Sequence, residues 1–184
     1  MKKVLILNLI ILLVFGFFLG CTATEPSETD DEQDQVNMED QDLPETDEAT
    51  TPSIVTDDNS LVTTMGSDGT WIVIFQEDLT TDKELVLEGE FMNDGVIARK
   101  LALYAQDAER NKTASYTLTA PKLTIRSENT RLQGGTFVGD IYVEANGFTI
   151  KDATVEGNIY FSSENFKSTF DTTEGTVTGN TEVQ

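Results

Sequence analysis

Histidine is absent from this chain of 184 residues, and cysteine occurs only once, at Cys21. Nucleophilic sites of the Ser-His-Asp and Cys-His types are therefore excluded, as are zinc sites built from His and Cys. A disulfide within the chain is excluded too, because it needs a second cysteine. Neither G-x-x-x-x-G-K-S/T nor G-x-G-x-x-G occurs, so no phosphate-binding loop is indicated. We expect a protein that is not an enzyme and has no cofactor and no metal site.

Basic residues are scarce. Lys and Arg together number 12 against 33 Asp and Glu, for a formal net charge of −21. Residues 61–184 alone carry ten basic and 19 acidic side chains, a net charge of −9. A nucleic-acid-binding protein needs a basic face, and direct binding to anionic lipid headgroups needs basic clusters. We therefore expect no nucleic-acid partner and no direct binding to anionic headgroups.

Only one long apolar run is present, Val4–Leu19, and it is interrupted by Asn8 and Gly16. It is short for a membrane span, which needs about 20 apolar residues. Lys2 and Lys3 precede it, as in the positively charged start of a secretory signal. Residues 1–20 are therefore predicted to be a signal peptide.

The end of this run, Phe18-Leu19-Gly20-Cys21, resembles the bacterial lipobox, although that motif usually has Leu where Phe18 stands. The resemblance implies that Cys21 becomes the first residue and is alkylated with diacylglycerol. Two or more acyl chains hold a protein stably on a membrane. The chain is then extracytoplasmic and lipid-anchored to the outer leaflet of the bacterial cell membrane. The alternative is an ordinary secretory signal with an accidental cysteine.

Residues 22–60 contain fourteen Asp and Glu and no Lys or Arg. Such a segment cannot bury enough apolar surface to offset the entropy of ordering, and its like charges keep it extended. Residues 21–60 are thus predicted to be a disordered acidic linker that begins with the lipidated Cys21. Its simplest role is a tether, and the alternatives are a docking tail for a basic partner and a weak site for Ca²⁺.

The C-terminal third repeats one pattern three times. Thr136–Val143 (TFVGDIYV) returns after 18 residues as Thr154–Phe161 (TVEGNIYF), and after 22 more as Thr176–Val183 (TVTGNTEV). Strand-like residues at a short period are typical of a stacked solenoid. We predict an all-β domain over residues 61–184, a single-stranded right-handed parallel β-helix of about five to six short rungs. An antiparallel β-sandwich also uses short strands and Gly turns, but it gives no reason for the 18-residue identity.

Glycine followed by Asp or Asn occurs at the same place in each copy, where the coil should turn. Gly tolerates positive φ, and Asn and Asp tolerate it better than most residues. Stacked Asn and Asp side chains would also hydrogen-bond from rung to rung. The predicted turn ladder comprises Gly139, Asp140, Gly157, Asn158, Gly179 and Asn180.

Alternation along the repeat places Tyr142 and Tyr160 on the outer surface, on adjacent rungs about 4.8 Å apart. Two such rings form a possible surface for a glycan or a protein partner, or an aromatic ladder that only stabilises the sheet. The third copy replaces the inward Ile by Thr181 and the Tyr by Glu182. We expect this polar copy to close the stack.

Carboxylates that an enzyme of the β-helix class would need are Asp140, Glu144, Asp152 and Glu156, with Arg131 or Lys151 nearby. In the 18-residue register Arg131 lies opposite Thr149 and Lys151 opposite Gln133, so no basic column forms. A carbohydrate-active β-helix enzyme, or its remnant, stays as an alternative that fold analogy alone supports.

The segments 116–125 (YTLTAPKLTI), 133–143 (QGGTFVGDIYV) and 158–161 (NIYF) resemble small right-handed β-helix proteins of bacteria, among them polymer-forming, bactofilin-like proteins. The resemblance implies a scaffold that associates weakly with itself or with envelope polymers. This chain differs in its export signal and its polar last copy. The leading expectation is a non-catalytic surface lipoprotein whose β-helix has a structural or binding role, with an envelope glycan or protein as partner.

Overall fold

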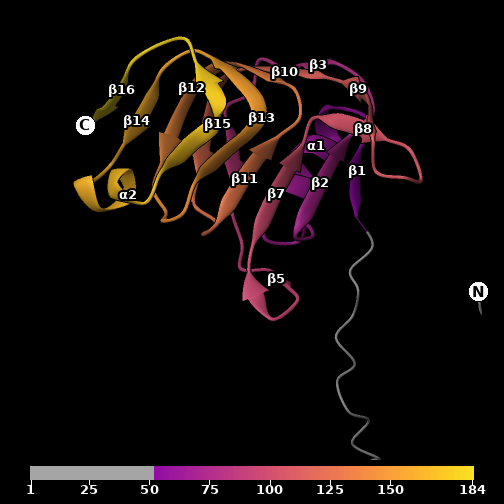
Figure 1. The fold of residues 1–184 in the computed structure, drawn as a ribbon, viewed down its shortest axis with the longest axis horizontal. Helices are drawn as coiled ribbons and strands as arrows, with labels where there is room; N and C mark the ends of the chain where they lie inside the picture. The colour runs from indigo at the N-terminus through magenta and orange to yellow at the C-terminus, as the bar shows by residue number, and fades with distance from the viewer. Residues whose placement is uncertain (1–51) are drawn as a thin grey trace, which may run out of the picture. The chain divides into compact units, whose positions relative to one another are not determined.

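The structure, a computed structural model, describes residues 52–184. The predicted signal peptide, Cys21 and the predicted linker up to residue 51 lie outside the described residues. The described part is mostly β, with a strongly curled sheet of parallel strands and two short helices (Figure 1). The prediction of a β domain with parallel strands therefore holds, whereas the prediction that it is all-β overlooked the helices.

The sheet consists of three ladders of parallel strand pairs. The first contains β1 (Ser53–Val55), β2 (Ile72–Phe75), β7 (Arg99–Ala102), β11 (Thr130–Gln133) and the starts of β13 (Thr149–Glu156) and β15 (Asp171–Val177). The second contains β3 (Leu79–Thr80), the starts of β10 (Thr117–Ile125) and β12 (Thr136–Val143), and the ends of β13 and β15. The third contains β4 (Leu85–Leu87), the ends of β10 and β12, β14 (Ile159–Phe161) and β16 (Thr181–Val183). Four long strands belong to two ladders each, so the sheet curls.

The three sequence repeats lie side by side in register. Thr136 pairs with Thr154, which pairs with Thr176, and Ile141 pairs with Ile159. The offsets are the 18 and 22 residues of the sequence repeat. One assignment was wrong: Leu101 does not align with Leu123, because it pairs with Leu132 in the first ladder.

Alternate side chains of every ladder point into one shared core. In the third ladder the column of inward residues is fully apolar until the last strand: Leu87, Ile125, Val143 and Phe161, each at most 1 % exposed, then the partly buried Val183. Burying one such side chain contributes about 1.5–3 kcal/mol. Apolar columns, rather than any single large residue, therefore hold the strands in register.

The N-terminal half departs most from the repeat. Two antiparallel hairpins interrupt it, β5–β6 (Met92–Asn93, Val96–Ile97) and β8–β9 (Tyr104–Gln106, Lys112–Ser115). Helix α1 (Asp58–Met65) places Leu61 and Met65 in the core, both at most 1 % exposed. Strand β1 and the start of α1 precede residue 61, where the composition placed the domain boundary. A short apolar strand and a helix cap escaped notice because carboxylates surround them.

Arg99 is buried at the junction of α1 and the first ladder, with 1 % of its surface exposed. Its guanidinium donates to the carbonyl oxygens of Thr70 and Thr64, the latter at 2.7 Å, and lies 4.1 Å from the centre of the Phe91 ring. Burial lowers the pKa of Arg99 to about 10, so the side chain keeps its charge at neutral pH. Arg99 therefore joins the C-terminal end of α1 to the sheet.

The last strands end the core with mixed chemistry. Thr181 occupies the inward position opposite Ile159, as the sequence predicts. Helix α2 (Glu164–Ser168) packs against β14 and β16, and Phe166, Phe170 and Val177 lie partly buried against the core. The closing copy is therefore less polar than its sequence implied.

Candidate functional site

The predicted turn ladder is present as a column of close backbone contacts. A Cβ atom added to Gly157 would lie 1.9 Å from the carbonyl oxygen of Gly139, and one added to Gly179 would lie 2.4 Å from that of Gly157. Of these three glycines only Gly139 has a positive φ, 137°. The reason given for these glycines was thus incomplete, because the space between strands requires them at all three positions and the backbone angle at only one.

Asp140, Asn158 and Asn180 form a ladder of hydrogen bonds along this column. Asp140 Oδ1 accepts from Asn158 N at 2.8 Å and from Asn158 Nδ2 at 3.0 Å. Asn158 Oδ1 in turn accepts from Asn180 N at 2.9 Å. These bonds use up the side-chain groups that a ligand would need, so the ladder is structural.

Tyr142 and Tyr160 pair in register on the outer side of the third ladder, with ring centres 5.0 Å apart. Their planes are inclined at 44°, so the rings do not form one flat platform. Lys122 Nζ lies 4.6 Å from the centre of the Tyr142 ring. Burial, and next the carboxylate of Asp140, raises the pKa of Tyr160. The tilt and the lysine favour an aromatic ladder over a sugar-stacking surface.

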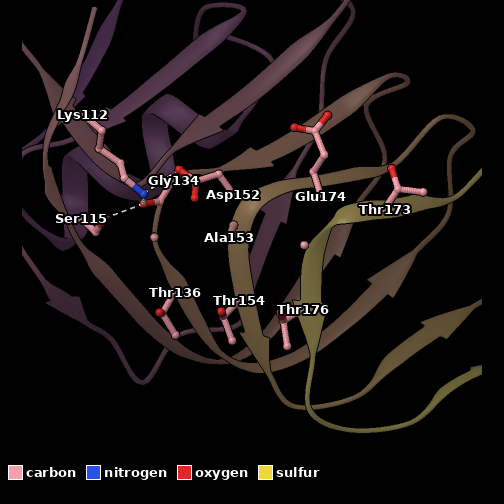
Figure 2. Close-up of a pocket in the computed structure, with 12 residues that line it drawn as sticks. Lys112, Ser115, Gly134, Thr136, Asp152, Ala153, Thr154, Thr173, Glu174 and Thr176 are labelled. Atoms are coloured by element: carbon pink, nitrogen blue, oxygen red, sulfur yellow. Dashed lines mark hydrogen bonds and ion pairs between the residues drawn. The ribbon is translucent and has the colours of Figure 1, made fainter.

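A larger polar hollow, named here the corner groove, lies where the first and second ladders meet (Figure 2). Its volume is about 440 Å³. One wall is the hairpin β8–β9, and the opposite side is a row of threonines on neighbouring strands, Thr136, Thr154 and Thr176. Its floor is made by the corners at Gly134–Gly135, Asp152–Ala153 and Glu174–Gly175.

Ion pairs and hydrogen bonds fasten the hairpin to the groove. Lys112 Nζ lies 2.6 Å from Asp152 Oδ2, and Ser115 Oγ donates to the carbonyl oxygen of Gly134 at 2.7 Å. At the other end, Lys151 Nζ lies 3.1 Å from Glu174 Oε1. Each ammonium group therefore faces one carboxylate, and these four charged side chains balance.

The floor of the groove is low because the packing of neighbouring strands leaves no room for side chains. A Cβ atom on Gly135 would lie 2.2 Å from the carbonyl oxygen of Tyr116, and one on Gly175 would lie 2.3 Å from Ile150 Cγ2. Between them stands Ala153, which is 7 % exposed. The result is a shallow trough that crosses the strands.

The residues considered for an enzyme do not gather in one place. Arg131 and Lys151 lie in the first ladder and Glu156 in the second, whereas Asp140 and Glu144 belong to the third. Glu144 is paired with Arg126 at 2.9 Å, and that hydrogen bond raises the pKa of Arg126. Only Asp152 lines the corner groove. The structure thus forms no cluster from these candidates.

The sequence missed half of the corner groove. Lys112 and Ser115 come from a hairpin outside the repeat, and the 22-residue step brings Glu174 beside Lys151. It also missed that Lys100 pairs with Arg131, two basic residues side by side in the first ladder. The repeat of Thr136, Thr154 and Thr176 was the one available signal, since it places hydroxyl groups on one line.

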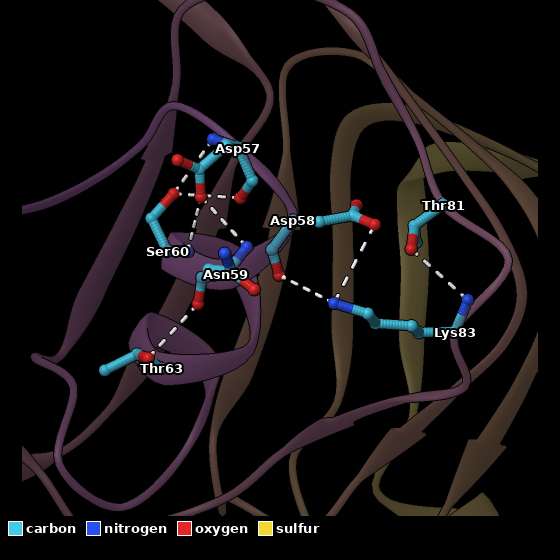
Figure 3. A network of polar contacts seen from close by, with 7 residues as sticks. All are labelled: Asp57, Asp58, Asn59, Ser60, Thr63, Thr81 and Lys83. Carbon is cyan, nitrogen blue, oxygen red and sulfur yellow. Dashed lines mark hydrogen bonds and ion pairs between the residues drawn. The ribbon is translucent and has the colours of Figure 1, made fainter.

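A second polar cluster surrounds the start of α1 (Figure 3). Asp57 Oδ1 accepts from Ser60 N at 2.7 Å, and Ser60 Oγ accepts from Asp57 N at 2.9 Å. These bonds make a capping box, and the backbone bond from Ser60 lowers the pKa of Asp57. Lys83 Nζ lies 3.8 Å from Asp58 Oδ2 nearby. Every group here serves the helix end, so this cluster is structural.

Within residues 52–184, no group of three or more Cys, Asp and Glu side chains is arranged to hold a metal ion. No helix in the same range is long and apolar enough to cross a membrane. Comparisons of the chain with protein-family models, with curated proteins and with solved structures find no match.

Proposed function

We propose that the curled sheet is a right-handed parallel β-helix of five rungs, with β1 and α1 at its start. Three ladders with a common core support this proposal, as do strand offsets of 18 to 22 residues. The hydrogen-bonded column of Asp140, Asn158 and Asn180 supports it further, because equivalent positions stack in a solenoid.

The function that this geometry supports best is that of a surface-anchored, non-catalytic binding module. A lipid on Cys21 holds the chain at the outer leaflet, residues 22–51 act as an acidic tether, and the β-helix contacts an envelope glycan or protein. The observation that carries this proposal is the corner groove, an open polar hollow of about 440 Å³ on a wall whose interior is apolar.

The carboxyl groups support a role without catalysis. A general acid at neutral pH needs a raised pKa. Hydrogen bonds from nearby main-chain and side-chain groups instead lower the pKa of Asp57, Asp107 and Asp171, each at a cap or turn. Asp140 and Asp152 are held by Asn158 and Lys112. An enzyme remnant would reveal itself by turnover of a polysaccharide, and a glycan panel tests this directly.

Two experiments test the proposal. Metabolic labelling with a fatty-acid analogue should label the wild-type chain but not Cys21→Ser, and only the wild type should stay with the membrane fraction. Binding of the chain to envelope extracts and glycans should be detectable without turnover. A wild-type chain that carries no lipid contradicts the anchor, and one that binds neither extracts nor glycans contradicts the binding role.

The tyrosine pair gives the second part of the binding test. If the partner contacts this face, the double variant Tyr142→Ala, Tyr160→Ala loses binding while it remains folded. Unchanged binding of the double variant excludes the tyrosine face and leaves the rest of the surface.

A self-assembling, bactofilin-like scaffold is the second candidate. Its support is that β15 and β16 each pair with only one neighbour among the described strands, so an edge is open. Asp171, Glu174 and Glu182 on these strands oppose such pairing, since charges on edge strands prevent association. Light scattering of the chain from Leu61 or from Thr22 decides the matter, and a monomer at high concentration excludes self-assembly.

A further inference from the structure

We infer that the corner groove binds an extended, uncharged polysaccharide chain that lies along the stack of strands and crosses β12, β13 and β15. This inference rests on the proposed function as a binding module, and it names the site and the class of ligand. The groove, its row of hydroxyl groups, its balanced charges and its low floor each contribute one step.

The row of hydroxyl groups supplies the polar contacts. Thr136, Thr154 and Thr176 occupy equivalent positions of three neighbouring strands and line the groove together (Figure 2). Neighbouring strands are about 4.8 Å apart, so the hydroxyl groups repeat at that interval. Among the described residues, none of the three hydroxyls has a hydrogen-bond partner, whereas Thr130 and Thr169 donate theirs to backbone carbonyls. They are therefore available to a ligand that carries hydroxyl groups of its own.

The main chain around the groove is already engaged, which excludes a peptide bound as an added strand. Thr136 N donates to Tyr116 O at 3.0 Å, and Thr154 N donates to Gly135 O at 2.9 Å. A peptide strand would need free N–H and C=O groups of this kind. The groove offers side-chain hydroxyls and charged groups instead, a set that suits a chain of sugar residues.

The charges decide between a neutral and an acidic polymer. Lys112 faces Asp152 at 2.6 Å and Lys151 faces Glu174 at 3.1 Å, so each lysine is already neutralised by a carboxylate. An acidic polysaccharide would have to break these pairs and would meet the negative field of a chain with a net charge of −21. An uncharged chain meets neither cost.

The low floor lets a flat chain approach the sheet closely. Gly135 and Gly175 have no room for a Cβ atom, and Ala153 stands between them. No aromatic side chain contributes to this floor, so each sugar residue binds weakly. Affinity then comes from several sugar residues on one polymer and from many copies of the protein on one surface, which act together.

The experiment uses the full-length chain in detergent micelles and three probes: cellohexaose and chitohexaose as neutral oligosaccharides, and hexagalacturonate as an acidic one. The test variant is Thr136→Val, Thr154→Val, Thr176→Val, in which each hydroxyl becomes a methyl group of similar size and strand propensity is kept. The matched control is Thr117→Val, which pairs with Thr136 in the same column but lies outside the groove. Calorimetric titration measures affinity, and circular dichroism verifies the fold.

We expect wild type and Thr117→Val to bind at least one neutral probe equally, and the triple variant to bind it roughly tenfold more weakly or worse. Equal binding by the triple variant, or tighter binding of hexagalacturonate than of both neutral probes, overturns the inference. Loss of binding in Tyr142→Ala, Tyr160→Ala but not in the triple variant also overturns it, while the proposed binding function stands. Absence of binding to every glycan and every envelope extract overturns both.

Discussion

Replacing Asn158 by aspartate tests whether the ladder of the turn column stabilises the fold as the geometry indicates. Asn158 donates through Nδ2 to Asp140 Oδ1 at 3.0 Å and accepts from Asn180 N at 2.9 Å. Asn158→Asp keeps the shape and the bond from Asn180, but it turns the donor into a second carboxylate oxygen beside Asp140. A single group therefore changes from attraction to repulsion.

The expected loss has two parts. A hydrogen bond to a charged acceptor contributes about 1.5–3 kcal/mol. Two carboxylates in contact at this half-buried site repel by about 1–2 kcal/mol, between the values for water and for a protein surface. Together they predict that Asn158→Asp lowers the free energy of unfolding by about 3 kcal/mol at neutral pH.

The pH dependence gives the sharper signature. Two carboxyl groups in contact share a proton more readily than separate ones, so the folded variant binds more protons than its unfolded chain at mildly acidic pH. Its stability relative to wild type therefore falls as pH rises, and the deficit shrinks to about 1 kcal/mol near pH 4, where the shared proton restores a hydrogen bond.

Urea unfolding of the chain from Thr22, followed by the fluorescence of the single tryptophan, Trp71, measures these values. Asn158→Ala removes the side-chain bonds without adding charge, so its deficit should stay constant between about pH 4 and pH 7. Asn180→Asp adds the same charge one strand further from Asp140 and should cost less than about 1 kcal/mol. A deficit of Asn158→Asp that does not change with pH would refute the reasoning.

Three further predictions follow from other contacts. Gly157→Ala should destabilise the domain by about 3 kcal/mol or more, because the new methyl group would lie 1.9 Å from Gly139 O; an unchanged melting temperature would contradict this. Arg99→Met should cost about 2–3 kcal/mol, since it leaves the carbonyls of Thr64 and Thr70 without donors, and hydrogen exchange should rise first in α1; uniform exchange would argue against it. Asp57→Ala should lower the melting temperature at neutral pH. Because the folded pKa of Asp57 lies below its ordinary value of 3.8, the wild-type advantage is present above that value and disappears as pH falls through the folded pKa. An advantage that persists in strong acid would exclude the cap as its source.

The repeat predicted much of the architecture. The identities between 136–143 and 154–161 give the register of β12 with β13 and β14, because only stacked parallel strands keep equivalent positions paired over several residues. The same comparison located the turn ladder and the outward tyrosines. It failed for Leu101, where the N-terminal strands share no identity with the later copies and their ladder cannot be deduced from spacing.

The corner groove was beyond the reach of the sequence for a related reason. Its wall comes from the hairpin β8–β9, which lies outside the repeat, and the partners Lys112 and Asp152 are 40 residues apart. No periodicity connects them, because an inserted hairpin takes its position from the corner at which it leaves the sheet. Side-chain direction also mattered: the tyrosines are adjacent as expected, yet rotation about their side chains tilts one ring by 44° against the other.

The sequence by itself thus determined that this chain has parallel strands stacked at an interval of 18 to 22 residues, since periodic identity reflects periodic contact. It also determined which chemistries are excluded, because absent His and Cys cannot be supplied by folding. The tertiary structure alone decided that α1 and a buried Arg99 begin the stack, and that threonines, glycines and two ion pairs enclose a groove. Those features depend on contacts between segments that share no pattern, and only the packed chain brings such segments together.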